Sequence, residues 1–143
     1  MIIKNYWMGP WDAGMNEPDT TPADFPQFTG TPYLVLAQGT ANCTNQGSGY
    51  HTVAIKFTAY VNTAAPGNPA DWIENGSAIS SVKVQNPSHS AVPTAYIQLT
   101  GTLPGQPVCV TATVDPATPN GAIGTDDYFS IAVAELEQTI PLL

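Results

Sequence analysis

The chain has 143 residues, the length of one domain, and a hydrophobic content of 43% argues against a disordered protein. Eleven acidic residues face three lysines and no arginine, which gives a formal net charge of -8. Because phosphate backbones and anionic membranes are both bound through basic side chains, this balance argues against a nucleic-acid or a membrane partner.

Residues 1–32 combine two features that rarely occur together. Five prolines are spaced so that neither a helix nor a central strand can run through the segment. The same residues include two of the three tryptophans, two of the four phenylalanines and every methionine. Burial of such a side chain contributes about 1.5–3 kcal/mol, so a solvated tail would not concentrate them. We therefore predict an extended N-terminal arm over 1–32 with these anchors: Trp7, Met8, Trp11, Met15, Phe25 and Phe28.

Two kinds of groove are open to this arm. It lies either in a groove of its own domain or in a groove of a neighbouring subunit, and composition does not decide between the two. In the second case the six anchors are partner-binding residues, because buried aromatic and methionine side chains carry much of the energy of protein interfaces.

From residue 33 onward, short apolar runs alternate with turn-forming residues, and no stretch keeps helical spacing for more than a turn or two. The clearest run is 52–62, where every second residue from Val53 to Val61 is apolar. Further strands are predicted at 33–37, 78–85, 94–100, 108–114 and 128–135. Such strands, each with one apolar face, predict an antiparallel β-sandwich over 33–136, with a jelly roll or small barrel as the alternative and a tail at 137–143.

The segment 95–114 resembles the middle of a fibronectin type III or related immunoglobulin-like (Ig-like) module. Its Leu-Pro-Gly turn at 103–105 matches the end of one strand of that family, and the alternation from Val108 to Ala112 matches the strand that returns across the sandwich. Val108 stands where the family has a tyrosine, and Phe57 is the nearest substitute for its core tryptophan. The resemblance implies an Ig-like sandwich and carries over no binding site.

Ig-like modules are frequent on tailed-phage particles, and an acidic sandwich with a proline-rich arm is similar in outline to phage capsid decoration (cement) proteins. We therefore expect a structural protein of a bacteriophage virion, a decoration subunit that binds and stabilises the assembled shell. Its expected partners are the major capsid protein or other virion subunits, and we expect a homo-oligomer. The chain begins without an apolar stretch of signal-peptide length, which predicts synthesis in the host cytoplasm and a final place on the capsid surface.

A carbohydrate-binding or adhesin-type sandwich is the alternative function. Tyr50, Tyr60, Trp72 and Tyr96 would then supply aromatic faces for sugar rings, with Asn and Asp side chains nearby for the hydroxyl groups. The same aromatic residues also suit the core or the rim of a sandwich.

No catalytic or metal-binding motif stands out in the sequence. His51 and His89 belong to no His-x-x-His or Glu-x-x-His pattern, and we expect both imidazoles to be exposed to solvent. Cys43 and Cys109 are compatible with one disulfide or with two thiols, and thiols are favoured where export is unproven. We therefore predict a protein that is not an enzyme and that holds no cofactor and no metal.

Asp126 and Asp127 form the densest carboxylate pair. Together with Asp71 or Asp115 they would suit Ca²⁺, since hard oxygen ligands bind that ion. We favour the simpler interpretation of a solvated loop at the end of a strand.

Overall fold

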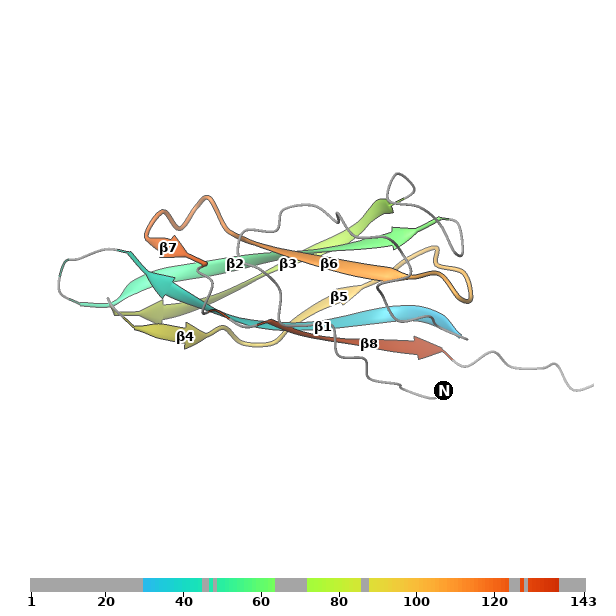
Figure 1. The fold of residues 1–143 in the computed structure, drawn as a ribbon, viewed down its shortest axis with the longest axis horizontal. Coiled ribbons are helices and arrows are strands. Elements are labelled where there is room, and N and C mark those ends of the chain that lie inside the picture. Colours follow the sequence, from blue (N-terminus) through green and yellow to red (C-terminus); the bar gives the residue numbers. More distant parts are fainter. Residues whose placement is uncertain are drawn as a thin grey trace, which may run out of the picture.

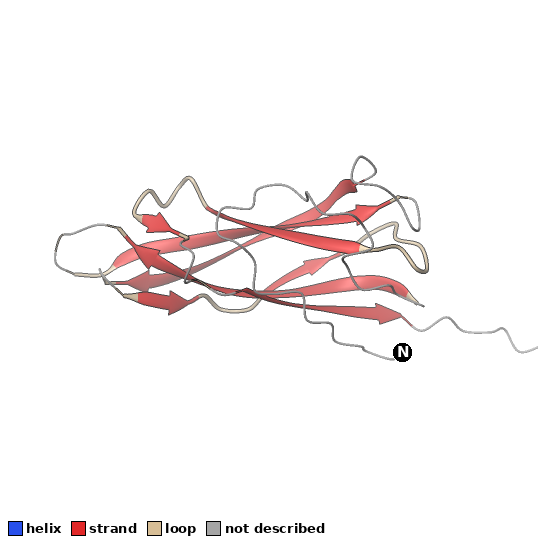
Figure 2. Cartoon of the chain, in the orientation of Figure 1, coloured by secondary structure: helices blue, strands red, loops and turns tan. Residues whose placement is uncertain are grey.

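The computed structural model describes residues 30–44, 47, 49–63, 72–85, 88–123, 127 and 129–136. These residues form two antiparallel sheets that pack as a β-sandwich (Figures 1 and 2). The strands are β1 (Thr31–Cys43), β2 (His51–Asn62), β3 (Trp72–Val84), β4 (His89–Ala91), β5 (Ala95–Gln98), β6 (Val108–Val114), β7 (Gly121–Ala122) and β8 (Phe129–Leu136). In this described part of the chain there is no helix long and apolar enough to cross a membrane.

β1 is the centre of the five-stranded sheet. Its residues Leu34–Ala37 pair with β5 along one edge and with β8 along the other. Farther along the strand, Asn42 pairs with both His89 of β4 and Ala122 of β7, so these two short strands extend the same sheet. Pro32 is compatible with this central strand because it lies near the strand's start, beside a β-bulge.

The three-stranded sheet has the order β3–β2–β6. β2 pairs with β3 from end to end and with β6 over Ile55–Val61. The ladder between β2 and β3 shifts register opposite Thr58 and Tyr60, and Gly76 of β3 has a φ of +94° there. A β-bulge with glycine in the left-handed region bends the strand at this point.

One side of the sandwich is closed by side chains that join the two sheets. Asn75 of β3 donates from Nδ2 to the carbonyl of Thr100 (2.8 Å) and accepts at Oδ1 from the Thr100 amide (3.0 Å). Farther along β3, the hydroxyl of Ser80 donates to the carbonyl of Pro93. These bonds hold the edge of one sheet against the strand β5 of the other.

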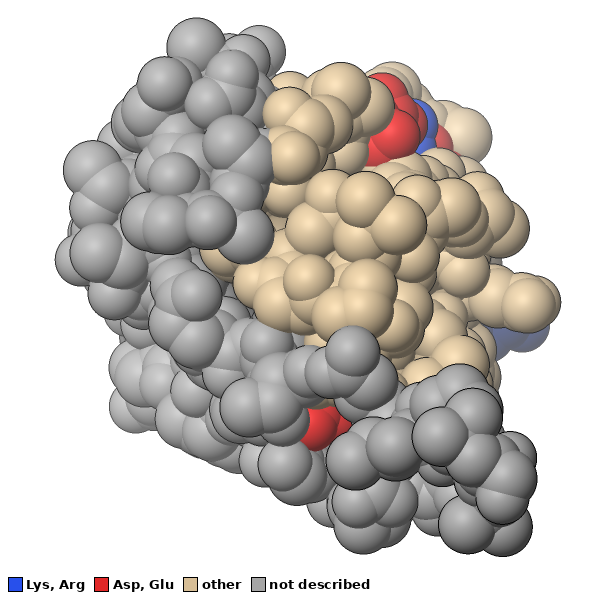
Figure 3. Space-filling model, turned by 90° about the vertical axis from the view of Figure 1, so that its right-hand side faces the viewer, with Lys and Arg blue, Asp and Glu red and all other residues tan. Residues whose placement is uncertain are grey.

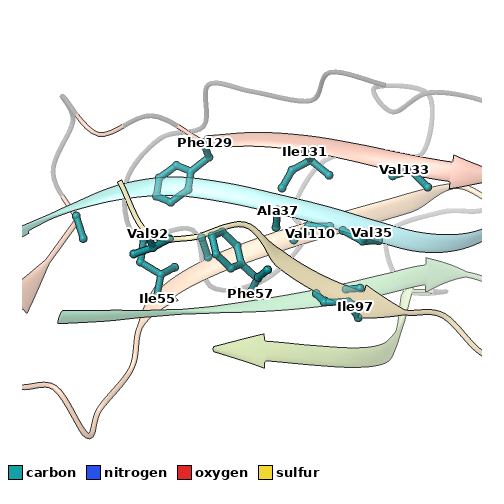
Figure 4. Close-up of a cluster of buried hydrophobic side chains, with 14 of the residues drawn as sticks. Val35, Ala37, Ile55, Phe57, Val92, Ile97, Val110, Phe129, Ile131 and Val133 are labelled. Carbon is teal, nitrogen blue, oxygen red and sulfur yellow. The ribbon is translucent and has the colours of Figure 1, made fainter. Parts of the chain in front are cut away.

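The core lies between the sheets and consists almost entirely of aliphatic side chains (Figure 4). Every second residue of β2 from Val53 to Val61 contributes to it, as the strict alternation predicts. Phe57 of β2 meets Phe129 of β8 edge to face, with ring centroids 6.3 Å apart. Since β2 and β8 belong to different sheets, this pair ties the two layers together.

The predicted sandwich is confirmed as two antiparallel sheets, while several strand limits differ from the prediction. β1 continues past the predicted strand 33–37 to Cys43, and β3 begins at Trp72, six residues before the predicted strand 78–85. The short strands β4 and β7 lie outside all the predicted strands. β1 also begins at Thr31, so the last two residues of the predicted arm belong to this strand.

Candidate functional site

The six predicted anchors of the arm, Trp7, Met8, Trp11, Met15, Phe25 and Phe28, lie outside the described residues. Asp71 and Asp126, which were considered with Asp127 as calcium ligands, lie outside them as well. The assignment of the anchors to a partner interface therefore stays a prediction.

Asp127 is a buried carboxylate with two polar side-chain partners. Its side chain has no exposed surface, and its Oδ1 lies 2.8 Å from Nδ1 of His89. The same oxygen accepts a hydrogen bond from Oγ1 of Thr40 at 2.9 Å. The interpretation of Asp127 as a solvated loop residue is therefore wrong: its carboxylate needs these partners because burial removes water from a charged group.

The Thr40–His89–Asp127 cluster joins three segments that are distant in sequence. Thr40 lies on the central strand β1, His89 opens β4 on one edge, and Asp127 precedes β8. Because β4 pairs directly with β1 at Asn42, the backbone register brings the imidazole beside the carboxylate. His89 thus lies in a short strand that the sequence pattern did not predict.

A carboxylate that holds an imidazole is also found in catalytic triads, where the imidazole activates a nucleophile. Here the hydroxyl of Thr40 donates to the carboxylate and not to the imidazole, so it is not arranged as a nucleophile for His89. Within the described ranges, no group of three His, Cys, Asp or Glu side chains is arranged to hold a metal ion. The side chains of Thr40, His89 and Asp127 thus hold β1, β4 and the segment before β8 together through polar contacts, and this cluster is called the polar lock.

The other reactive side chains are distributed over separate places. His51 starts β2 and is half-buried, and its Nε2 atom is buried without a hydrogen-bond partner among the described residues. This corrects the expectation that its imidazole is solvent-exposed. Cys43 and Cys109 are both buried thiols that form no disulfide. Cys43 belongs to the core between the sheets, whereas Cys109 does not.

The aromatic residues considered for sugar binding do not gather on one surface. Tyr50 is 69% exposed in the connection that leads into β2, and Tyr96 is 63% exposed on β5 of the other sheet. Tyr60 and Trp72 are only half-buried and lie close together, because Tyr60 pairs with Glu74 and Trp72 pairs with the nearby Asn62. Two of the four rings are therefore open enough to stack on a ligand.

The outward surface formed by Leu34–Gln38 of β1 together with β5 and β8, called here the β1 face, carries no charged side chain at its described positions. Paired residues of adjacent strands share a face, so Leu36 lies between Tyr96 of β5 and Ala132 of β8. The β1 face comprises these outward residues, of which Ala134 is only 1% exposed: Leu34, Leu36, Gln38, Tyr96, Gln98, Ser130, Ala132 and Ala134. Figure 3 shows one end of the sandwich, where uncharged residues make up most of the described surface in view.

No family model matches the chain, and no curated protein or solved structure is significantly similar to it. The β1 face, the polar lock and the exposed tyrosines are therefore the features on which a functional assignment depends.

Proposed function

We propose that the protein is a structural subunit of a virus particle, a capsid decoration or cement protein that docks on the assembled shell through its β1 face. The observation that carries this proposal is an uncharged sheet surface on which Tyr96 of the edge strand β5, 63% exposed, lies next to the half-buried Leu34 and Leu36 of β1. The cores of protein interfaces are depleted in charged residues and enriched in aromatic ones, which is the composition of this face.

The cement role follows from linkage between binding and assembly. A subunit that binds the assembled shell and not its separate parts stabilises the shell by mass action, without any chemical step. Such a subunit needs a rigid module that presents a fixed surface. The sandwich meets this need, because its core is closed by aliphatic packing and its open side is fastened by the Asn75 and Ser80 hydrogen bonds.

The finer fold class belongs to the same proposal. Pairing of β1 with β5 in one sheet and of β2 with β6 in the other supports an Ig-like arrangement, in which strands B and E share one sheet and strands C and F share the other. The last strand departs from that pattern, since β8 pairs with β1 and not with β6. We infer an Ig-related sandwich whose final strand has joined the opposite sheet.

The docking surface is tested with a single charge placed on the β1 face. Tyr96→Glu should weaken binding to shells that lack this subunit by roughly 30-fold, as expected when an exposed aromatic anchor of an interface is replaced by a charge. Tyr50→Glu is the matched control, because Tyr50 is equally exposed but lies off this face. Cosedimentation with the shells measures both affinities. Equal affinities for the two variants would rule out docking through the β1 face.

A carbohydrate-binding module remains the second candidate, because the exposure of Tyr50 and Tyr96 leaves two aromatic rings available for stacking on sugars. A glycan array on the full chain separates the two functions. Binding to a defined sugar that is lost in Tyr50→Ala or Tyr96→Ala would support the sugar-binding role. Binding to shells without any glycan signal would support the cement role.

A further inference from the structure

The outward surface of the three-stranded sheet, called here the β2 face, is covered although the core lies on the opposite side of the sheet. Cys109 is 1% exposed, Thr111 is 2% exposed and Thr58 is 9% exposed. Thr58 and Thr111 are direct partners in the ladder between β2 and β6, and they alternate with the core residues Phe57 and Val110. A two-layer sandwich leaves such positions in water, so a further layer of protein must account for their burial.

The charges of the β2 face indicate what kind of segment covers it. Lys56 and Lys83, the only lysines in the described ranges, both point to this side, because they pair with Ile79 and Thr52 on the outward positions. Glu74 is the one acidic residue among the outward positions that β2 and β3 pair. An acidic segment with apolar anchors therefore suits this surface.

Residues 1–29 have this composition. They contain four carboxylates, on Asp12, Glu17, Asp19 and Asp24, against the single lysine Lys4. They also contain Trp7 and Trp11 together with two phenylalanines and all three methionines. The segment thus combines negative charge with the large apolar side chains that need burial.

Residues 1–29 join the sandwich close to the start of β6, which is a strand of the β2 face. The amide of Gly105 donates to the carbonyl of Gly30 at 3.0 Å, which fixes the end of the segment three residues before β6 begins at Val108. β6 spans roughly 23 Å at about 3.3 Å per residue. Residues 1–29 reach up to roughly 95 Å when extended, so they are long enough to follow β6 and return.

We propose that residues 1–29 pack on the β2 face of their own subunit and form a third layer over β2 and β6. This assigns the anchors Trp7 and Trp11 to a contact within the chain, which is one of the two alternatives that composition left open. The inference is independent of docking through the β1 face, which lies on the other side of the molecule.

Cys109 and Cys43 provide the test, because one thiol lies on the β2 face and the other lies in the core. The full-length Cys43→Ala variant keeps only the Cys109 thiol, and Cys109→Ala keeps only the Cys43 thiol. The rate of reaction with an aromatic disulfide reagent therefore measures the accessibility of one thiol at a time. Deletion of 1–29 should accelerate labelling of Cys109 by at least 100-fold and leave Cys43 protected. Synthetic peptide 1–29 added to the truncated protein should restore the protection of Cys109. Continued protection of Cys109 after the deletion would overturn the proposal.

A full-length variant guards against loss of the fold in the truncated protein. If Cys43 also becomes reactive on truncation, the measurement is made on Trp7→Ser/Trp11→Ser, where Cys109 should react faster and Cys43 should not. Unchanged Cys109 labelling in that variant would overturn the proposal. Labelling is repeated from about 1 to 100 µM protein with light scattering. Protection that rises together with dimer formation would show that a second copy covers the face, and it would overturn packing within the subunit.

Discussion

Gly76 of β3 lies so close to the other sheet that a Cβ atom on it would come within 2.9 Å of Cγ2 of Ile97. Its φ of +94° is also one that side chains rarely adopt. Gly76→Ala should therefore lower the free energy of unfolding by about 2–4 kcal/mol, through backbone strain together with overpacking against a core residue. Urea unfolding followed by tryptophan fluorescence measures the change.

Gly49 is the matched control for this substitution. Its φ is +97°, but no atom lies within 4 Å of the position that a Cβ would occupy. Gly49→Ala should therefore cost only the backbone strain, about 1 kcal/mol. Equal losses for the two alanine variants would mean that the approach of β3 to Ile97 is not as close as described.

Asp127 should be the polar residue whose removal weakens the five-stranded sheet most. Asp127→Ala leaves the hydroxyl of Thr40 and the imidazole of His89 without their common acceptor, and we expect a loss of about 2–3 kcal/mol in unfolding free energy. Asp127→Asn should lose less, because the amide oxygen still accepts a hydrogen bond. Chemical denaturation of both variants gives the comparison.

Thr40 and His89, the two partners of Asp127, should contribute unequally to the free energy of unfolding. Thr40→Val removes a donor to a buried carboxylate and should cost about 1–2 kcal/mol. His89→Gln should cost under about 1 kcal/mol, because the His89 side chain is 37% exposed and solvent screens its interaction. A double-mutant cycle between positions 89 and 127 that gives no coupling would contradict the polar lock.

Sequence patterns were sufficient to predict the limits of those strands that alternate strictly between one buried and one outward face. β2, β6 and β8 were predicted nearly to the residue, because a period of two is the geometric signature of a half-buried strand. β4 and β7 were missed because strands of three and two residues are too short to display a period. The first half of β3 was missed because Glu74–Ser77 is polar and contains the bulge at Gly76, so only its register with β2 defines it.

The candidate sites were harder to predict because they depend on contacts between distant segments. His89 and Asp127 are 38 residues apart, and neither shows a local motif. They meet only because β4 and the segment before β8 both flank β1, which is a property of the topology and not of any short stretch. The burial of Cys109 is likewise not visible in the sequence, because alternation along β6 alone indicates an outward residue there.

The contact between Phe57 and Phe129 should carry an interaction energy of its own. The rings come from different sheets and meet at an interplanar angle of 77°. Phe57→Leu and Phe129→Leu should each lower the unfolding free energy by about 1–2 kcal/mol, and the double variant should lose about 0.5–1.5 kcal/mol less than their sum. Pairing Phe57→Leu with Ile79→Ala, on the opposite side of the sheet, should give additive losses.

Asn75 should determine how firmly the free edge of β3 is held against β5. Its side chain supplies both a donor and an acceptor to Thr100, so Asn75→Ala removes two hydrogen bonds and should cost about 1–2 kcal/mol. Asn75→Asp should lose at least as much, because the carboxylate keeps the acceptor but faces the Thr100 carbonyl without a donor. Ser81→Ala, at an exposed site on the same strand, should change stability by less than about 0.5 kcal/mol. Hydrogen exchange of the Thr100 amide gives a local measure: it should accelerate in Asn75→Ala, and unchanged protection would mean that the sheets are joined at this side by other contacts.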